Sequence, residues 1–253
     1  MTAQKVLGGL KPDTLLGPDR RAFTGSNIGI IVAEANYAKL PGNVANASTY
    51  RFPVIYESLD GVTSEQIMAG DPAVESIVIA GGRRLERRGA KAVFGACGSF
   101  ANYQSAVNTA LSVPVFLSSM LQVPWILVGL NDSQKLLVIC ASTSTMTKAV
   151  FAQCRIESDD RLIFAQVRDL PQFRSMVTRN SYNPSALEDE VVSQAQELVD
   201  SNLSIAAILL QCSDLPPFAA AIQRATGLPV FDMNSLIEWV EFGLDRHNYD
   251  GFL

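Results

Sequence analysis

The chain repeats one order of elements, and each copy contains a cysteine at the matching place. Cys97 and Cys212 each end an apolar run and precede an amphipathic stretch, and they lie 115 residues apart. A Pro-Val-Phe segment begins 17 residues after each cysteine, at Pro114 and at Pro229. This repetition indicates an internal duplication. If the two halves face each other, two thiols meet across a cleft, which suits the removal of a proton from one face of a carbon and its supply to the other.

Apolar runs of strand length alternate with amphipathic stretches along the chain. The runs contain many β-branched residues and few charges, as buried strands of a parallel sheet do. Strands are predicted at 28–33, 52–56, 92–96, 113–116, 136–140, 162–165, 206–210 and 229–231, and helices at 71–88, 99–111, 118–128, 147–153, 186–202, 218–226 and 235–244. Alternating strands and helices predict an α/β fold whose parallel sheets are covered by helices on both sides.

The duplication also predicts how the chain divides into domains. We expect a first lobe, carrying Cys97, from residues 27–133 together with 232–253, because the last helix can close back onto the first half. A second lobe, carrying Cys212, is expected from residues 134–231. Residues 1–26 are rich in glycine, proline and charged residues, and they predict an irregular N-terminal arm.

The overall composition excludes several classes of function. A net charge of −5 argues against a general nucleic-acid binder, which would show a basic face. Residues 92–131 contain no charged residue, but prolines and polar residues interrupt them, so we expect no membrane span. The N-terminus has no apolar core of signal-peptide length, and the four cysteines include no Cys-x-x-Cys. We therefore expect a cytoplasmic protein with free thiols.

Other common chemistries find little support in the sequence. The one histidine, His247, lies seven residues from the end, which argues against a Cys-His dyad or a histidine-ligated metal. No Gly-x-Gly-x-x-Gly follows a strand, and no phosphate loop of the Walker type occurs. Cys140 lies within an apolar strand and Cys154 ends a helix, so both are interpreted as small buried hydrophobic residues.

The positions of the paired cysteines favour reactive thiols. Ligands of open parallel sheets bind beyond the carboxyl ends of the strands, where both cysteines fall. Each cysteine also precedes a predicted helix, with Ser99 as a candidate cap after Cys97 and Ser213 or Asp214 after Cys212. A helix start lowers the pKa of a thiol from about 8.5 toward roughly 7. Asp214 opposes this effect, so we expect Cys97 to ionise more easily than Cys212.

Several motifs resemble those of the aspartate/glutamate racemase superfamily over residues 28–240. They are Pro-Gly-Asn-Val-Ala-Asn at 41–46, Thr-Tyr-Arg-Phe-Pro-Val at 49–54, Cys-Gly-Ser-Phe at 97–100, Phe-Leu-Ser-Ser-Met-Leu-Gln-Val-Pro at 116–124 and Cys-Ser-Asp-Leu-Pro-Pro-Phe at 212–218. Asn43 stands where the family more usually has Asp, and Ser213 where it usually has Thr. Asn36-Tyr37 and the Leu-Pro-Pro-Phe segment are similar to the dimethylsulfoniopropionate lyase branch.

The resemblance implies two Rossmann-like lobes with parallel sheets, related by pseudo-twofold symmetry, and an active site in the cleft between them. It implies catalysis on a small carboxylate without metal, nicotinamide or pyridoxal, and a homo-oligomer is expected. Cys97 and Cys212 would be the catalytic acid and base. The candidate substrate-binding residues are Asn36, Tyr37, Gly98, Ser99, Ser118, Ser142, Thr143, Ser213 and Asp214.

Three functions remain open at this stage. The leading one is a cofactor-independent racemase or epimerase of an amino-acid-like carbon acid, in which one thiolate takes the α-proton and the other thiol returns a proton. The first alternative is a β-elimination lyase on the same scaffold, similar to the dimethylsulfoniopropionate lyases. The second is a ligand-binding protein without catalysis, although binding alone would not need a matched pair of thiols.

Overall fold

The computed structural model describes residues 25–246, 248 and 249. The strands of this part are β1 (Ile28–Glu34), β2 (Val54–Thr63), β3 (Ala92–Gly95), β4 (Val115–Phe116), β5 (Lys135–Cys140), β6 (Leu162–Gln166), β7 (Ile205–Leu210) and β8 (Val230–Phe231). The α-helices are α2 (Ser64–Ala69), α3 (Glu75–Arg87), α4 (Gln104–Ala110), α5 (Val123–Val128), α6 (Lys148–Gln153), α7 (Pro171–Arg179), α8 (Pro184–Ser201), α9 (Ala219–Thr226) and α10 (Met233–Leu244). The predicted arm, apart from residues 25 and 26, and His247 lie outside the described residues.

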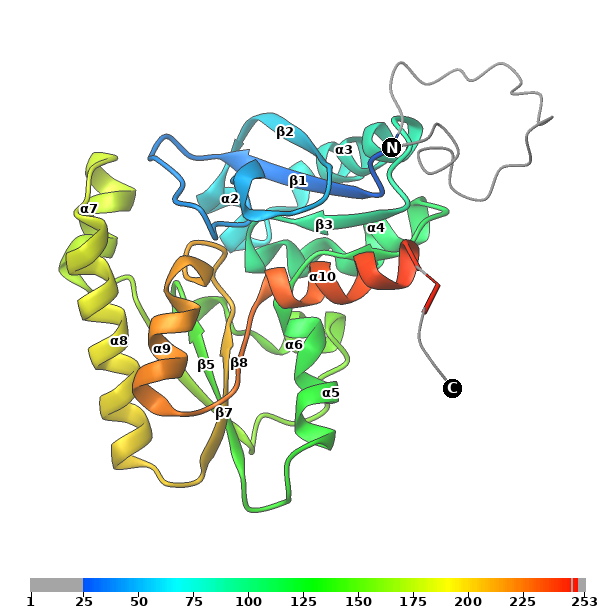
Figure 1. Ribbon diagram of the computed structural model, residues 1–253. Coiled ribbons are helices and arrows are strands. Elements are labelled where there is room, and N and C mark those ends of the chain that lie inside the picture. The colour runs from blue at the N-terminus through cyan, green and yellow to red at the C-terminus, as the bar shows by residue number, and fades with distance from the viewer. Residues whose placement is uncertain (1–24, 247, 250–253) are drawn as a thin grey trace.

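The strands form two parallel sheets with equivalent topologies. The first has the order β2-β1-β3-β4 and the second the order β6-β5-β7-β8. The successive strands of each half therefore occupy the same relative positions in their sheet. Every pairing within both sheets is parallel. Figure 1 shows the two halves one above the other, with α10 running between them. The predicted α/β architecture of two helix-covered parallel sheets is confirmed.

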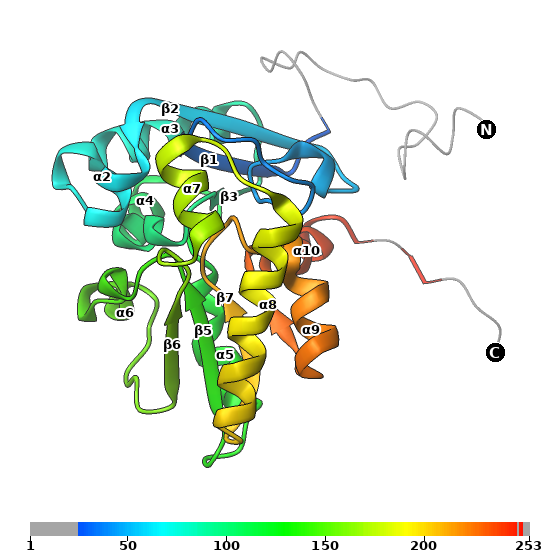
Figure 2. The ribbon, with the colours of Figure 1, turned by 90° about the vertical axis from the view of Figure 1, so that its left-hand side faces the viewer.

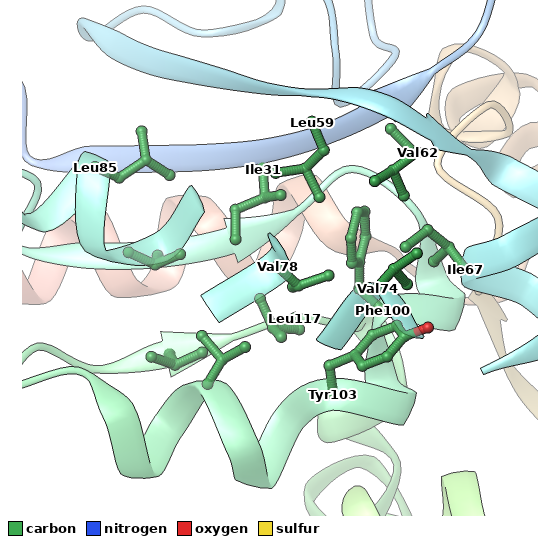
Figure 3. Close-up of a cluster of buried hydrophobic side chains, with 14 of the residues drawn as sticks. Ile31, Leu59, Val62, Ile67, Val74, Val78, Leu85, Phe100, Tyr103 and Leu117 are labelled. Atoms are coloured by element: carbon green, nitrogen blue, oxygen red, sulfur yellow. The ribbon is translucent and has the colours of Figure 1, made fainter. Parts of the chain in front are cut away.

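The first sheet buries both of its faces, as its near-continuous apolar strands require. One face of the sheet presents Ile31 and Val93 to α2, α3 and α4, where Val78 and Phe100 are fully buried (Figure 3). The opposite face carries the alternate residues of the same strands. There Ile28, Ile30, Ala92 and Phe94 pack against Met233, Leu236, Ile237 and Val240 of α10. The last helix of the chain therefore covers the first sheet.

The second sheet is covered in the same manner. One face packs Leu137, Ile139, Ile208 and Leu210 against α7, α8 and α9. The other face packs Leu136, Val138 and Leu209 against α6, α5 and the 3-10 turn η4 (Ser119–Gln122). Figure 2 shows α7, α8 and α9 on one side of these strands. Residues 119–128 follow the first sheet in the sequence, but they pack on the second.

The two halves thus exchange a helix. The segment 119–128 leaves the first sheet and covers the second, while α10 leaves the second sheet and covers the first. The two segments also contact each other, because Gln122 Nε2 donates a hydrogen bond to Asp232 O over 2.7 Å. The division into residues 27–133 with 232–253 and residues 134–231 stays a proposal. The packing places residues 119–128 with the second sheet.

Some elements differ from the sequence predictions. The strand expected at 52–56 runs to Thr63, and α2 and α7 lie in segments for which we predicted no helix. The amphipathic stretches after both cysteines begin as 3-10 turns, η3 (Gly98–Tyr103) and η6 (Pro216–Phe218), before α4 and α9 start. Helical periodicity does not separate the two helix types, because tight 3-10 turns are common where helices begin. No helix among the described residues is long and apolar enough to cross a membrane.

Candidate active site

The two cysteine segments pack directly against each other at the carboxyl ends of β3 and β7. Ser213 Oγ donates a hydrogen bond to Ala96 O over 3.0 Å, which joins the neighbours of the two cysteines. A side chain at Gly98 would bring its Cβ within 2.3 Å of the backbone oxygen of Gln211, so glycine permits this approach. A negative charge on Cys97 would raise the pKa of the Cys212 thiol further.

The sulfur of Cys97 lies among hydrogen-bond donors. The backbone N–H groups of Ser99 and Phe100 and the hydroxyl of Ser99 lie near this sulfur and favour a thiolate. Burial has the larger and opposite effect and raises the pKa of the Cys97 thiol to about 11, with a further contribution from the Asp214 carboxylate. Cys97 remains partly exposed, whereas Cys212 is 8% exposed.

Cys212 lies beside a carboxylate. Its thiol donates to Asp214 Oδ2 over 3.7 Å. Burial raises the pKa of the Cys212 thiol well above its ordinary value, and the charge of Asp214 raises it further. The backbone N–H group of Asp214 opposes these effects and lowers the pKa of the thiol. The two sulfurs therefore have different environments: donor groups lie near the sulfur of Cys97, and the thiol of Cys212 contacts a carboxylate.

Asp214 connects the two halves of the molecule. Its Oδ2 accepts a hydrogen bond from Tyr37 over 2.8 Å, and its Oδ1 accepts one from Asn43 Nδ2 over 2.6 Å. Tyr37 and Asn43 belong to the loop after β1, which reaches across to the second sheet. Val44 N also donates to Ser213 O over 3.4 Å. Burial raises the pKa of the Asp214 carboxyl, while the bonds from Tyr37 and Asn43 oppose that rise.

Two expectations about this region are wrong. Neither Ser99, Ser213 nor Asp214 caps a helix: the N-caps of η3 and η6 are Cys97 and Leu215, without side-chain capping bonds. The expected fall in thiol pKa also does not occur, because the α-helices begin several residues later and burial dominates. The serines instead contact sulfur and the backbone of the opposite half.

The remaining predicted residues are distributed around the same edges of the sheets. Ser118 is fully buried and accepts a hydrogen bond from Met120 N. Ser142 follows β5 and lies 2.8 Å from Ser144 Oγ, and it also accepts a hydrogen bond from Arg168. Thr143 is exposed, and its N–H and hydroxyl both donate to Gln166. Asn36 is exposed at the carboxyl end of β1. Cys140 and Cys154 are buried, as predicted.

Three polar residues near the cysteines were not among the residues predicted for the site. Asn43, considered only as a motif residue, binds Asp214. Lys39 Nζ lies 4.0 Å from the ring centroid of Tyr37. Gln211, next to Cys212, is 3% exposed, and its Nε2 has no hydrogen-bond partner among the described residues. Their signal in the sequence was weak, because each lies in a loop or a strand end without a periodic pattern.

Two hollows on the described surface lie elsewhere. One, of about 460 Å³, is lined by residues of α3 together with Ala110, and the other lies between Asn27 and Asp245. Neither contains a cysteine. Within the described residues, no group of three or more His, Cys, Asp or Glu side chains is placed to hold a metal ion. The chemistry that the site offers is therefore that of two thiols, a carboxylate and a phenol.

Comparison with known proteins shows similarity by sequence to several dimethylsulfoniopropionate lyases. No family model matches the chain. The chain is 26% identical over 238 residues to dimethylsulfoniopropionate lyase 3 of Emiliania huxleyi, and the match covers 87% of this chain and 62% of that protein. The chain thus spans less than two thirds of the length of this relative.

Solved structures show which class of fold this is. Unliganded arylmalonate decarboxylase matches with a TM-score of 0.58 and 20% identity, over 89% of this chain and 94% of that chain. Allantoin racemase from Klebsiella pneumoniae matches with a TM-score of 0.59 and 16% identity, over 86% and 87%. The chain therefore has the fold of the aspartate/glutamate racemase superfamily, as its motifs predicted, and dimethylsulfoniopropionate lyases are its homologues at about 26% identity.

Proposed function

We propose that the protein is a cofactor-independent lyase that eliminates a leaving group from the β-carbon of a small carboxylate. Dimethylsulfoniopropionate is the first substrate to test, because the curated relatives are named for its cleavage. The observation that carries the proposal is the inequality of the two sulfurs. Donor groups of Ser99 and Phe100 lie near the Cys97 sulfur and lower its pKa, whereas the Cys212 thiol donates a hydrogen bond to Asp214.

This inequality favours elimination over racemisation. A racemase acts on both enantiomers, so each of its two bases must serve as acid and as base in turn. An elimination needs one base, because the carbon that loses its proton does not regain one. Cys97, with three donors at its sulfur, is suited to the thiolate form. Cys212, held as a thiol by burial and by Asp214, is suited to remain protonated.

The proposed reaction has a simple balance. The Cys97 thiolate takes the α-proton, and the electrons of the C–H bond form the new C=C bond. The bond between the β-carbon and the leaving group breaks, and the leaving group departs with the bonding pair. From dimethylsulfoniopropionate the products are acrylate, dimethyl sulfide and the Cys97 thiol, which returns its proton to water. Negative charge that develops on the substrate carboxylate needs nearby donors, for which Gly98, Ser99 and Ser213 are our candidates.

Racemisation is the second candidate function. Its support is the matched position of the two thiols, since Cys212 lies at the same strand end of the second sheet as Cys97 in the first. In that reaction Cys212 would supply a proton to the face of the carbon opposite Cys97. The substrate would be an amino acid or a related carbon acid.

Incubation in heavy water separates the candidates. Dimethylsulfoniopropionate, amino acids and hydantoins are incubated with the wild-type protein, and the products are read by NMR. A lyase releases acrylate and dimethyl sulfide, whereas a racemase washes deuterium into the α-carbon of recovered substrate. Cys97→Ser abolishes the first activity, and Cys154→Ala, which removes a buried thiol that the proposed reaction does not use, preserves it. Recovery of every substrate unchanged and without deuterium would overturn both candidates and leave a binding protein.

A further inference from the structure

Three acidic groups share the junction between the two halves. The charge of Asp214 acts on Cys97 and on Cys212, and the charge of Cys97 also acts on Cys212. The hydroxyl of Tyr37 lies within reach of all three charges. Asp214 is itself partly exposed, although its carboxylate oxygens are held by Tyr37 and Asn43. A fixed carboxylate therefore lies beside the thiol of Cys212 and acts on that of Cys97.

An aromatic ring accompanies this carboxylate and already receives a cation. Lys39 Nζ lies 4.0 Å from the centroid of the Tyr37 ring, and it donates to the carbonyl oxygens of Ala35 and Tyr37 over 2.7 and 3.0 Å. The charge of Asp214 acts on Lys39 as well. The charge of Asp214 also raises the pKa of a second phenol, that of Tyr182, whose hydroxyl donates to Ala38 O over 2.8 Å. The faces of aromatic rings attract cations, and proteins use such rings to bind quaternary ammonium groups.

The charges at the junction do not balance when a thiol ionises. With a thiolate at Cys97, the cluster contains two negative charges, on Cys97 and Asp214, and one positive charge, on Lys39. A second cation within this cluster would favour the thiolate, because an opposite charge stabilises the charged form. A substrate that brings its own positive charge would therefore help to generate the base that attacks it.

We propose that Asp214 and the ring of Tyr37 form the subsite for a positively charged group of the substrate, a sulfonium or a quaternary ammonium. The inference rests on the proposed lyase function, in which that group is the one that leaves. It assigns Asp214, which the sequence indicated only as a candidate substrate-binding residue, to recognition of the cation. Tyr37 has two functions there: its hydroxyl fixes the carboxylate and its ring contacts the cation.

Two ligands of equal shape and different charge test the subsite. They are 3-(trimethylammonio)propanoate and 4,4-dimethylpentanoate, which differ in the exchange of a cationic nitrogen for a neutral carbon. Their dissociation constants are measured by calorimetry in the Cys97→Ser background, so that neither is turned over. We expect the cationic ligand to bind at least tenfold more tightly. Equal affinities for the two ligands would overturn the inference.

Variants show which residues produce the preference. Asp214→Asn is expected to reduce the ratio between the two dissociation constants to less than threefold, mostly by weakening the binding of the cationic ligand. Tyr37→Leu, which removes the ring, is expected to divide this ratio by at least three. Tyr37→Phe, which keeps the ring, is expected to change the ratio less than twofold. Asp189→Asn removes an exposed carboxylate on α8 and is the matched control. If Asp214→Asn does not fold, the comparison of the two Tyr37 variants decides, and equal effects of Leu and Phe would contradict the proposal.

The outcomes also distinguish this inference from the proposed function. Release of acrylate by the wild-type protein, together with no preference for the cationic ligand, would retain the lyase and reject the subsite. A preference that depends on Asp214, together with no release of acrylate, would retain the subsite and reject the lyase.

Discussion

At the scale of single residues, burial decides the state of both reactive sulfurs more than any one neighbour does. Desolvation disfavours a thiolate, and it outweighs the donors around Cys97. The difference between the two cysteines then comes from their polar contacts. Hydrogen-bond donors surround Cys97, and a carboxylate lies beside Cys212.

The pH dependence of alkylation tests the environment of Cys97. Its pKa of about 11 means that the thiolate fraction increases about tenfold per pH unit through the neutral and mildly alkaline range. We therefore expect iodoacetamide to modify Cys97 about a thousandfold faster at pH 10 than at pH 7, after correction for the reagent, as measured by mass spectrometry of the labelled peptide. Cys140 and Cys154, which are 0% and 1% exposed, are internal controls that stay unmodified. A rate that levels off below pH 9 would contradict the assigned environment.

Gly98 gives a second prediction at this scale. In Gly98→Ala the added Cβ would lie 2.3 Å from the Gln211 backbone oxygen, which cannot move without shifting the end of β7. The two cysteine segments must separate, at a cost of about 1–3 kcal/mol in stability. We expect a lower Tm and at least tenfold faster alkylation of Cys212. The matched control is Gly243→Ala, at an exposed glycine of α10 with open space around it. We expect this variant neither to lower the Tm nor to accelerate the alkylation of Cys212. Unchanged alkylation of Cys212 would show that the junction tolerates the methyl group.

Spacing along the sequence was sufficient to identify Cys97 and Cys212, but not the groups that surround them. The equal distance from each cysteine to a Pro-Val-Phe segment is a property of the sequence alone. The bonds of Asp214 to Tyr37 and Asn43 join residues more than 170 positions apart, and no local pattern encodes such contacts. The capping roles expected for Ser99 and Ser213 were wrong: the Ser99 hydroxyl lies near the Cys97 sulfur, and the Ser213 hydroxyl donates to Ala96 O of the other half.

At the scale of elements, periodicity located the buried strands and the long helices well. The predicted strands at 92–96, 136–140 and 206–210 match β3, β5 and β7 to within one residue. Short elements were harder, since α2 has 6 residues and α7 begins with a proline in a polar segment. Their stability comes from packing against a sheet, which the local sequence does not show.

The start of α10 provides a prediction about stability and pH. Asp232 is the N-cap of this helix and is 7% exposed, and burial raises its pKa to about 6. Because the folded-state pKa exceeds that of the unfolded chain, the folded state is relatively stabilised at pH 4 and loses that advantage as the pH rises through 6. Asp232→Asn keeps an acceptor for Ser235 N and removes the buried charge.

We expect Asp232→Asn to unfold at a higher temperature than the wild type at pH 7.5 and at a similar temperature at pH 4. The gain at the higher pH is at most about 3 kcal/mol, since each pKa unit corresponds to about 1.4 kcal/mol. Asp232→Ala, which also loses the cap, should be less stable than Asp232→Asn at both pH values by about 1 kcal/mol. Thermal unfolding followed by circular dichroism measures all three proteins. A similar gain at both pH values would show that the charge of Asp232 is not the cause.

At the scale of the whole molecule, the exchange of covering segments couples the two halves. The first sheet is complete only when α10, the last helix of the chain, has packed on Ile28, Ile30 and Phe94. The second sheet needs the segment 119–128, which precedes β5, the first strand of that sheet, in the sequence. The sequence predicted the return of the last helix. The corresponding crossing of 119–128 was not predicted, because an apolar helix shows that it is buried but not against which sheet.

Fragments of the chain test this exchange directly. Residues 119–231 contain the second sheet with covers on both faces, whereas residues 134–231 lack Met120, Val123 and Ile126. These three buried side chains contribute roughly 1.5–3 kcal/mol each, a sum comparable with the 5–15 kcal/mol that stabilises a whole domain. We therefore expect the fragment 119–231 to show dispersed amide signals by NMR and a cooperative thermal transition, and the fragment 134–231 to show neither. If the shorter fragment folds equally well, the segment 119–128 belongs with the first half after all, and a division of the molecule near residue 134 describes its folding units better than the exchange does.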